Sequence, residues 1–242
     1  MDIGTVSVVW IDPPPDEIKE YWWNLWYNAK HGPERFRLPG LVAWRRFEVV
    51  PGMPEAMATP EPYKYFTLSD RRDTTAGLSQ AYRDLVATNY AESEDPNTGE
   101  WLHMQAEWVA DSYDHRYSLE DDYQPPYSEY LLVVGHNVEA DREAAFDAWM
   151  REECLVRLAG MAGYISARHL QPSEGFSHPR HVHRSDRMSP QRLTLCDLDS
   201  MDGMDPSTFK DLGEPPGVER ATCQLYKRLY PYAGFRHAST LT

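Results

Sequence analysis

The sequence predicts an α+β fold in which one unit, strand, helix, strand, strand, helix, strand, occurs twice along the chain. Apolar residues alternate along the expected strands and recur at helical spacing along the expected helices in both halves. The halves also align at one constant offset of 123 residues, which pairs Trp26 with Trp149, Gly40 with Gly163, and Arg45 with Arg168. With 242 residues, 41% of them hydrophobic, the chain is long enough to bury a substantial core.

The first repeat is expected to cover residues 1–117. A strand at residues 5–11 is ended by the prolines that precede Asp16, where a helix begins. That helix should end near Gly32 and pack through one apolar face, made of Ile18, Trp22, Leu25, Trp26 and Ala29. The rest of the unit comprises strands at 41–50 and 63–69, a second helix around 78–86, and a last strand at 106–117.

The second repeat is expected to cover residues 130–242. Its first helix carries Phe146, Trp149 and Met150, and a short second helix lies near Phe209 and Leu212. Its strands are expected at 130–134, 164–170, 192–196 and 221–229. Residues 118–129, which are acidic and proline-containing, form the expected linker, and residues 171–190 form a polar loop.

Composition argues against several classes of function. There are 24 Lys and Arg residues against 38 Asp and Glu, a net charge of −14, which should repel nucleic acids. No apolar run is long enough for a signal sequence or a membrane span, so we expect no membrane partner. Three cysteines without Cys-x-x-Cys spacing argue against a disulfide framework and a structural zinc site, and a cytoplasmic location is expected.

Three short segments of the first half resemble the EthD-like family of the dimeric α+β barrel superfamily. They are Trp26-Tyr27-Asn28-Ala29-Lys30-His31, Leu38-Pro39-Gly40 and Arg45-Arg46. Members of that family are usually single ferredoxin-like units that pair sheet against sheet. The resemblance implies two ferredoxin-like repeats whose antiparallel sheets face each other within one chain, and a homodimer is a further possibility. Cys154 stands where the second half would carry the aligned histidine.

Strand alternation predicts which side chains face the cavity between the two sheets. If Phe66, Leu68, Leu193 and Leu195 pack on helices, Tyr65 and Thr67 point inward. Arg45 and Arg168 are expected to face the cavity as well. The two last strands should contribute Asp111, Tyr113, His115, Gln224, Tyr226 and Arg228.

The candidate catalytic residues are those suited to proton transfer and hydrogen bonding. The resemblance implies that His31 acts as a base, whereas its position alone favours a cap at the helix end. Asp111, Tyr113 and His115 could form a proton relay, or they could be the ordinary polar face of a strand. Tyr65 could donate a hydrogen bond to a developing oxyanion.

Arginines are the candidate substrate-binding residues. Arg45 and Arg168 suit a carboxylate or an enolate, and the competing interpretation is a pair of salt bridges to neighbouring acids. Tyr226 and Arg228 share the predicted inward face and complete the set. His178, His181 and His183 are interpreted as part of a solvated or lid loop, with metal binding as the alternative.

These residues and the resemblance together predict one catalytic centre per chain, in the first-half cavity. The leading hypothesis is a cofactor-independent lyase-type enzyme, with decarboxylase, dehydratase or cyclase chemistry on an aromatic or polyketide-like small molecule. It requires no cofactor and no metal. The alternatives are a cofactor-free monooxygenase of the same fold and a non-catalytic small-molecule-binding protein.

Overall fold

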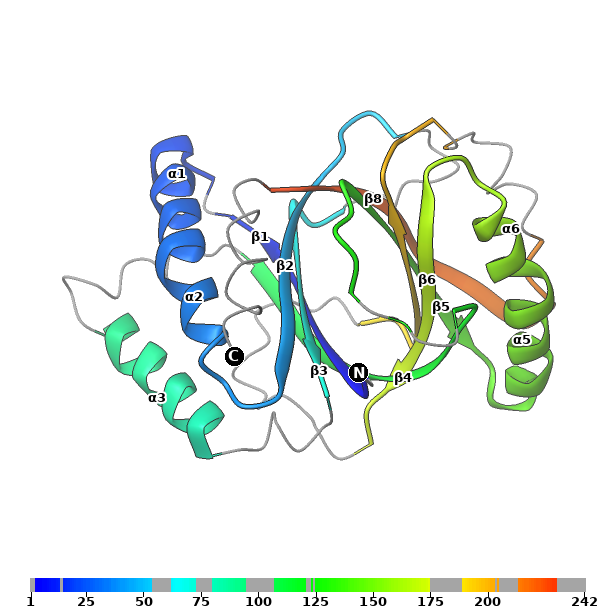
Figure 1. The fold of residues 1–242 in the computed structure, drawn as a ribbon, viewed down its shortest axis with the longest axis horizontal. Coiled ribbons are helices and arrows are strands. Elements are labelled where there is room, and N and C mark those ends of the chain that lie inside the picture. Colours follow the sequence, from blue (N-terminus) through cyan, green and yellow to red (C-terminus); the bar gives the residue numbers. More distant parts are fainter. Residues whose placement is uncertain are drawn as a thin grey trace.

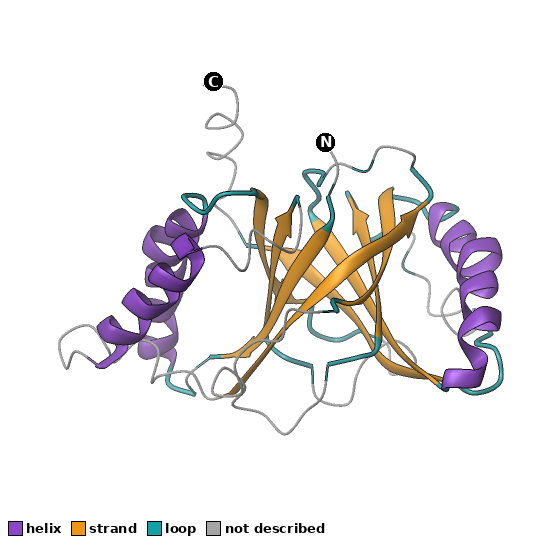
Figure 2. Ribbon diagram, turned by 90° about the horizontal axis from the view of Figure 1, so that it is seen from below, coloured by secondary structure: helices purple, strands orange, loops and turns teal. Residues whose placement is uncertain are grey.

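A computed structural model describes most of the chain, and its strands form a closed antiparallel barrel in the order β1-β3-β2-β8-β5-β7-β6-β4 (Figure 1). Helices pack on the outside of this barrel on two opposite sides (Figure 2). The described residues are 3–13, 15–53, 62–72, 80–94, 107–120, 123, 125–174, 189–202, 204 and 213–229. The predicted fold class, an α+β protein with two antiparallel sheets that face each other, is therefore confirmed.

The strands of the two halves follow one another in the same way. Their bounds are β1 (Thr5–Asp12), β2 (Leu41–Val49), β3 (Tyr65–Arg71), β4 (Glu107–Ser118), β5 (Tyr130–Val138), β6 (Tyr164–Pro172), β7 (Arg192–Leu198) and β8 (Val218–Arg228). Within the first four strands the order is β2-β3-β1-β4, and within the last four it is β6-β7-β5-β8. In both halves the second strand is therefore followed by the third, the first and the fourth. The barrel closes where β2 pairs with β8 and β4 pairs with β6.

The helices of the two halves also correspond. The first half contains α1 (Glu17–Trp26), a π-helical turn (Tyr27–His31), α2 (Gly32–Arg35) and α3 (Gln80–Glu94). The second half contains a 3₁₀ turn (Ala140–Arg142), α5 (Glu143–Trp149), a π-helical turn (Met150–Cys154) and α6 (Leu155–Ala159). The two π-helical turns lie at the same offset of 123 residues as the aligned sequence positions.

The first helix does not end near Gly32, as the sequence predicted, but continues to Arg35. Pro33 lies in the first turn of α2, where its missing N–H is not needed, and the preceding π-helical turn lets the chain continue through it. The expected short helix near Phe209 and Leu212 lies outside the described residues.

Apolar side chains form one cluster inside the barrel and one under the helices of each half. The interior cluster draws on all eight strands, with Phe66, Leu68, Leu193, Leu195 and Tyr226 among its members. On the second-half side, Phe146, Met150 and Cys154 of the helical segment pack against strand residues such as Leu225. Strand residues beneath α1 pack against Trp23 and Tyr27.

The apolar face predicted for α1 is wrong. Ile18, Trp22 and Leu25 are 71%, 47% and 46% exposed, whereas Trp23 is fully buried against the sheet. The reason lies on the sheet, where the guanidinium of Arg46 is buried beneath this helix. Arg46 requires polar and aromatic neighbours, so the side of the helix that supplies them packs inward.

The predicted orientations of β3 and β7 are also wrong. Phe66 and Leu68 point into the barrel, and so do Leu193 and Leu195, whereas Tyr65 packs beneath α1. Both faces of these strands are covered, one by helices and one by the opposite sheet, so both carry buried apolar residues. Alternation alone therefore does not distinguish the two faces.

Substitution of Gly32 by alanine tests how tightly α2 packs on β2. A Cβ atom at Gly32 would lie 2.4 Å from Cζ3 of Trp44, which is too close without a shift of the ring or the helix. We expect Gly32→Ala to lower the free energy of unfolding by about 1–3 kcal/mol, as overpacking typically does. Gly160→Ala is the matched control, because its Cβ would meet only ordinary contacts, at 3.4 Å or more. Urea unfolding of both variants gives the measurement, and equal effects would contradict the close approach.

Candidate active site

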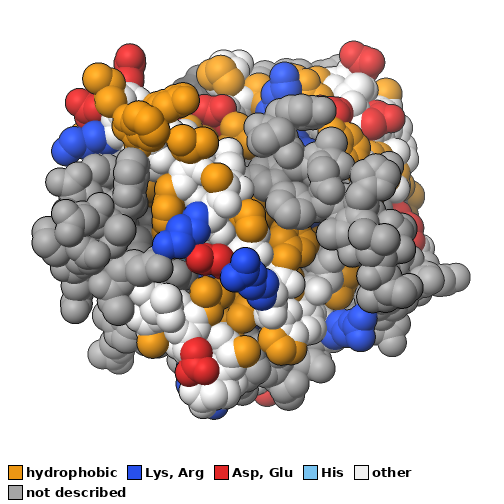
Figure 3. All heavy atoms as spheres, turned by 60° about the vertical axis from the view of Figure 1, so that its left-hand side comes forward, with side chains coloured by type: hydrophobic (Ala, Val, Ile, Leu, Met, Phe, Trp, Pro, Cys, Tyr) orange, Lys and Arg blue, Asp and Glu red, His pale blue; other side chains and the backbone are white. Residues whose placement is uncertain are grey.

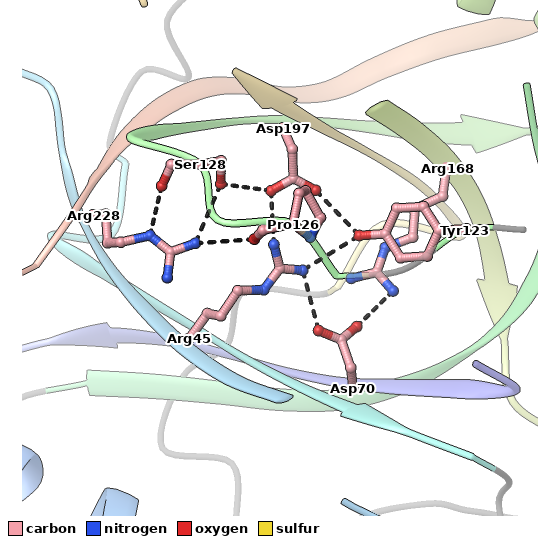
Figure 4. A network of polar contacts seen from close by, with 8 residues as sticks. All are labelled: Arg45, Asp70, Tyr123, Pro126, Ser128, Arg168, Asp197 and Arg228. Atoms are coloured by element: carbon pink, nitrogen blue, oxygen red, sulfur yellow. Dashed lines mark hydrogen bonds and ion pairs between the residues drawn. The ribbon is translucent and has the colours of Figure 1, made fainter. Parts of the chain in front are cut away.

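Four charged residues from both halves meet at the centre of the barrel (Figure 4). Arg45 on β2 donates to Asp197 Oδ1 on β7 at 2.7 Å and to Asp70 Oδ2 on β3 at 3.1 Å. Arg168 on β6 forms an ion pair between Nη1 and Asp70 Oδ1 at 2.5 Å. All four side chains are at most 4% exposed. Each arginine is thus paired with the aspartate of the opposite half.

Burial and pairing act in opposite directions on these charges. Burial alone would raise the pKa of Asp70, but Arg168 and Arg45 lower it below its ordinary value. Burial likewise disfavours the charged form of Arg45, yet Asp197 and Asp70 raise its pKa above the ordinary value. Both groups therefore stay ionised at neutral pH.

The segment that connects the two halves enters the same interior. Tyr123 donates from its hydroxyl to Asp197 Oδ2 at 3.1 Å, and Ser128 Oγ donates to Asp197 Oδ1 at 2.7 Å. Arg228 on β8 donates to the carbonyl oxygen of Ser128 at 2.5 Å and to that of Pro126 at 3.4 Å. Figure 4 shows this segment running beside the guanidinium of Arg228. The expected linker is therefore in part an interior element of the barrel.

His115 on β4 lies beside this cluster. Its ring stacks on Tyr123 with centroids 6.3 Å apart, and the guanidinium carbon of Arg168 lies 4.6 Å from the centre of the same Tyr123 ring. Burial and then the positive charge of Arg168 lower the pKa of His115 below its ordinary value of 6.5. Both effects favour the neutral form of the His115 imidazole.

Both residues retain unused polar atoms within the part of the chain that the structure describes. His115 Nε2 is buried there without a hydrogen-bond partner, and so are Nε and Nη2 of Arg168. One imidazole nitrogen and two guanidinium nitrogens thus lack a described hydrogen-bond partner, and both side chains contact the ring of Tyr123. A bound anion could accept from Arg168 while His115 receives a proton.

The proposed relay along β4 is not connected by hydrogen bonds among the described contacts. Tyr113 does point into the barrel, but its hydroxyl donates to the carbonyl oxygen of Pro190 at 2.8 Å. Asp111 accepts from the backbone N–H of Ser112. Burial, followed by the charge of Asp111, raises the pKa of Tyr113 well above its ordinary value. Of the three, His115 alone stacks, among the described contacts, on Tyr123, which in turn donates to Asp197 of the charged cluster.

Tyr226 faces inward as predicted, but its hydroxyl is engaged by the protein. It donates to the carbonyl oxygen of Tyr63 at 3.3 Å, and its ring stacks on Phe66 at 5.2 Å. Burial raises the pKa of Tyr226. Its contacts are those of a core side chain.

Two predicted site residues lie outside the barrel, beneath the first-half helices. His31 packs between Trp26 and Tyr27, and its Nε2 accepts from Arg35 Nε at 3.4 Å. Burial, then Arg35, lowers the pKa of His31 well below its ordinary value. Tyr65 donates to Glu20 of α1. The expected grouping of both residues with Arg45 is thus wrong, and His31 does not cap a helix end, because the helix continues past it.

Sequence reasoning missed the aspartates that pair with the arginines, and it missed the interior role of Tyr123 and Ser128. The signal for the aspartates was present. Phe66 and Leu68 align with Leu193 and Leu195 at an offset of 127 residues, and this offset also aligns Asp70 with Asp197. The segment containing His178, His181 and His183 lies outside the described residues.

Within the described helices, none combines the length and apolar character that a membrane crossing requires. The three cysteines, Cys154, Cys196 and Cys223, are buried free thiols.

Comparison with solved structures identifies the architecture. The chain superposes on an anthrone oxidase-like protein with a TM-score of 0.55 at 9% identity, over 95% of this chain and 92% of that one. A Lactobacillus acidophilus protein named provisionally as a monooxygenase gives 0.53 at 8% identity, over 94% of each chain. A chlorite dismutase variant from Candidatus Nitrospira defluvii gives 0.57 at 9% identity, over 95% and 93%. These are dimeric α+β barrel proteins, and this chain has the same fold.

Comparison by sequence is negative at both levels. No family model matches the chain. No curated protein matches it either.

Removal of one buried charge tests the central cluster. Asp197→Asn leaves Arg45 with Asp70 as its remaining carboxylate, and we expect the free energy of unfolding to fall by about 3–5 kcal/mol, as for other broken buried pairs. Asp147→Asn is the control, because the ion pair of Asp147 with Arg116 is solvent-accessible. Its cost should be at most about 1 kcal/mol. Denaturant unfolding at pH 7 measures both, and a small effect of Asp197→Asn would contradict a structural role.

Proposed function

We propose that this chain is an enzyme that removes a proton from an acidic aromatic small molecule inside the barrel, with His115 as the base. The observation that carries the proposal is that His115, whose pKa is lowered, and Arg168 both contact the ring of Tyr123, each with a polar atom unused within the described structure. A base works best when it is unprotonated at the working pH and close to a group that stabilises the product anion. Arg168 would bind that anion as an enolate or phenolate oxygen.

One site per chain follows from the different environments of two equivalent positions. Along the last strands, His115 of the first half corresponds to Arg228 of the second half. Arg228 is satisfied by the backbone of the connecting segment, as described above. His115 and Arg168 keep unused atoms among the described residues. The connecting segment would therefore fill one of the two equivalent places and leave the other for substrate.

The step after proton removal decides the reaction class. The lyase-type chemistry expected from the sequence and the monooxygenase alternative both pass through the same stabilised anion. The names of two structural neighbours, an anthrone oxidase-like protein and a protein provisionally called a monooxygenase, favour reaction of that anion with dioxygen. For anthrone, loss of a proton from the methylene carbon gives the enolate. Addition of O₂ and loss of water then give anthraquinone, which balances as anthrone plus O₂ to anthraquinone plus H₂O.

We also propose that the chain arose by duplication of an EthD-like unit and that residues 1–117 and 130–242 are the repeats. The shared strand order, the two π-helical turns 123 residues apart and the aligned pairs Arg45/Arg168 and Asp70/Asp197 support it. The motif around His31 supports the EthD-like relationship.

Turnover by His115→Phe protein tests the proposed base. With anthrone and with 2,6-dihydroxybenzoate as probes, dioxygen uptake and CO₂ release separate oxygenase from lyase chemistry. Loss of the base should lower turnover by about 100- to 10,000-fold. Arg116→Gln, on the outward side of the same strand, is the control and should keep near-normal turnover. Exhaustive chelation of the parent protein tests the expected independence from metals. Undiminished turnover by His115→Phe, or neither binding nor conversion of both probes by the parent, would contradict the proposal.

The pH profile should report the same residue. Because the pKa of His115 lies below 6.5, kcat/KM should fall only as the pH drops below that value and protonates the base. Arg168→Met removes the nearby positive charge, so the acidic limb should move upward toward 6.5 while Arg116→Met leaves it in place. An unshifted limb in Arg168→Met would argue against His115 as the titrating group.

A further inference from the structure

The outer side of α1 carries an apolar stripe that the sheet does not cover. Ile18, Tyr21, Trp22 and Leu25 are 71%, 62%, 47% and 46% exposed, and they recur at positions i, i+3, i+4 and i+7. Figure 3 shows hydrophobic side chains gathered at the top of the face that includes this helix. We refer to these four residues as the α1 stripe. They expose on the order of 400 Å² of mostly apolar surface, a size typical of interaction sites.

The stripe is not a by-product of a loosely packed helix. The opposite side of α1 makes specific contacts with the sheet, where Asn24 Oδ1 and Asn28 Oδ1 accept from Arg46 at 2.6 and 2.9 Å. Trp23 is fully buried on the same side. Rotation of α1 to bury the stripe would remove the partners of a fully buried guanidinium. The helix therefore keeps its apolar stripe outward.

We propose that the α1 stripe binds the same stripe of a second copy of this chain, with the two helices antiparallel. Spacing of i, i+3, i+4 and i+7 is the pattern by which two helices pack along a common seam. A two-fold axis between Tyr21 and Trp22 places Ile18 of each copy opposite Leu25 of the other. The surface is then complementary to itself, as a two-fold interface requires.

The charges along this helix favour the antiparallel arrangement. The first turn carries Glu17, whereas Lys30 lies in the π-helical turn beyond the stripe. An antiparallel pair places the acidic first turns of the two copies, each with Glu17 and Glu20, at opposite ends of the seam. Opposed helix dipoles add to this preference. A parallel pair would instead bring like charges together.

A lipid surface fits less well as the occupant. Asp16 and Glu17 lie at one end of the stripe. Acidic membranes would repel both. An apolar contact of this size is smaller than the standard of about 800 Å² per partner, so the dimer should be reversible, with a dissociation constant of about 1–100 µM.

Analytical ultracentrifugation of the full chain over a range of concentrations tests the dimer. The parent should shift from monomer to dimer as its concentration rises, and Ile18→Glu/Leu25→Glu should raise the dissociation constant at least tenfold. Val156→Glu is the matched control, because Val156 is a 53% exposed apolar residue on α6 of the other half. A parent that stays monomeric at about 500 µM, well above the expected dissociation constant, overturns the proposal. A dimer that is unchanged by the double substitution overturns it too, as does equal weakening by Val156→Glu.

Cysteine crosslinking tests the orientation. Under mild oxidation, Tyr21→Cys should crosslink with itself, and a mixture of Ile18→Cys and Leu25→Cys should form the mixed dimer. Ile18→Cys alone should not crosslink, whereas a parallel pair would allow it. The unsubstituted protein is the control, since its own cysteines are buried. Sedimentation of the parent with phosphatidylserine vesicles as monomer, without self-association, would identify a lipid surface instead and overturn the proposal.

Discussion

The pairing of each central arginine with the aspartate of the opposite half is the interaction on which the rest of the barrel depends. Arg45 and Arg168 are buried where two sheets meet, and a charge in that position is tolerated only with a partner across the interface. Because Asp197 and Asp70 come from opposite halves, neither half can bury its arginine in the same way without the other. Around this polar centre the first-half and second-half strands offer equivalent positions, such as those of His115 and Arg228.

The connecting segment makes those equivalent positions different. It enters the barrel with Tyr123 and Ser128, both of which donate to Asp197, and its backbone accepts from Arg228. A segment that passes through the interior once can supply hydrogen-bond partners to only one of the two equivalent positions. The proposed location of the substrate, beside His115 and Arg168, is the consequence of that single passage. The expected linker thus has a structural role inside the barrel that its acidic, proline-containing composition did not indicate.

Sequence patterns predicted the α+β fold with two facing antiparallel sheets, the approximate strand positions and the inward direction of Arg45 and Arg168, because these follow from periodicity and from one constant offset. They failed where both sides of an element are chemically similar. Tyr65 alternates with Phe66 on a strand that is buried on both faces, so either assignment satisfied the pattern. The aspartates were within reach of an alignment argument, whereas Tyr123 was not, since no local pattern tells a connecting segment to turn inward.

The apolar face predicted for α1 is wrong for a different physical reason. The same reason explains why this helix exposes apolar residues on the surface. Arg45 and Arg46 are neighbours on β2, so they point to opposite faces of the sheet, one into the barrel and one toward the helix. The guanidinium carbon of Arg46 lies 4.3 Å from the ring centre of Tyr27, and the Arg46 side chain is fully buried. The need of Arg46 for amide and aromatic partners outweighs the burial of the apolar α1 stripe, because an unpaired buried cation costs more than an exposed leucine. The α1 stripe therefore stays on the surface, where the proposed second copy of the chain would bury it.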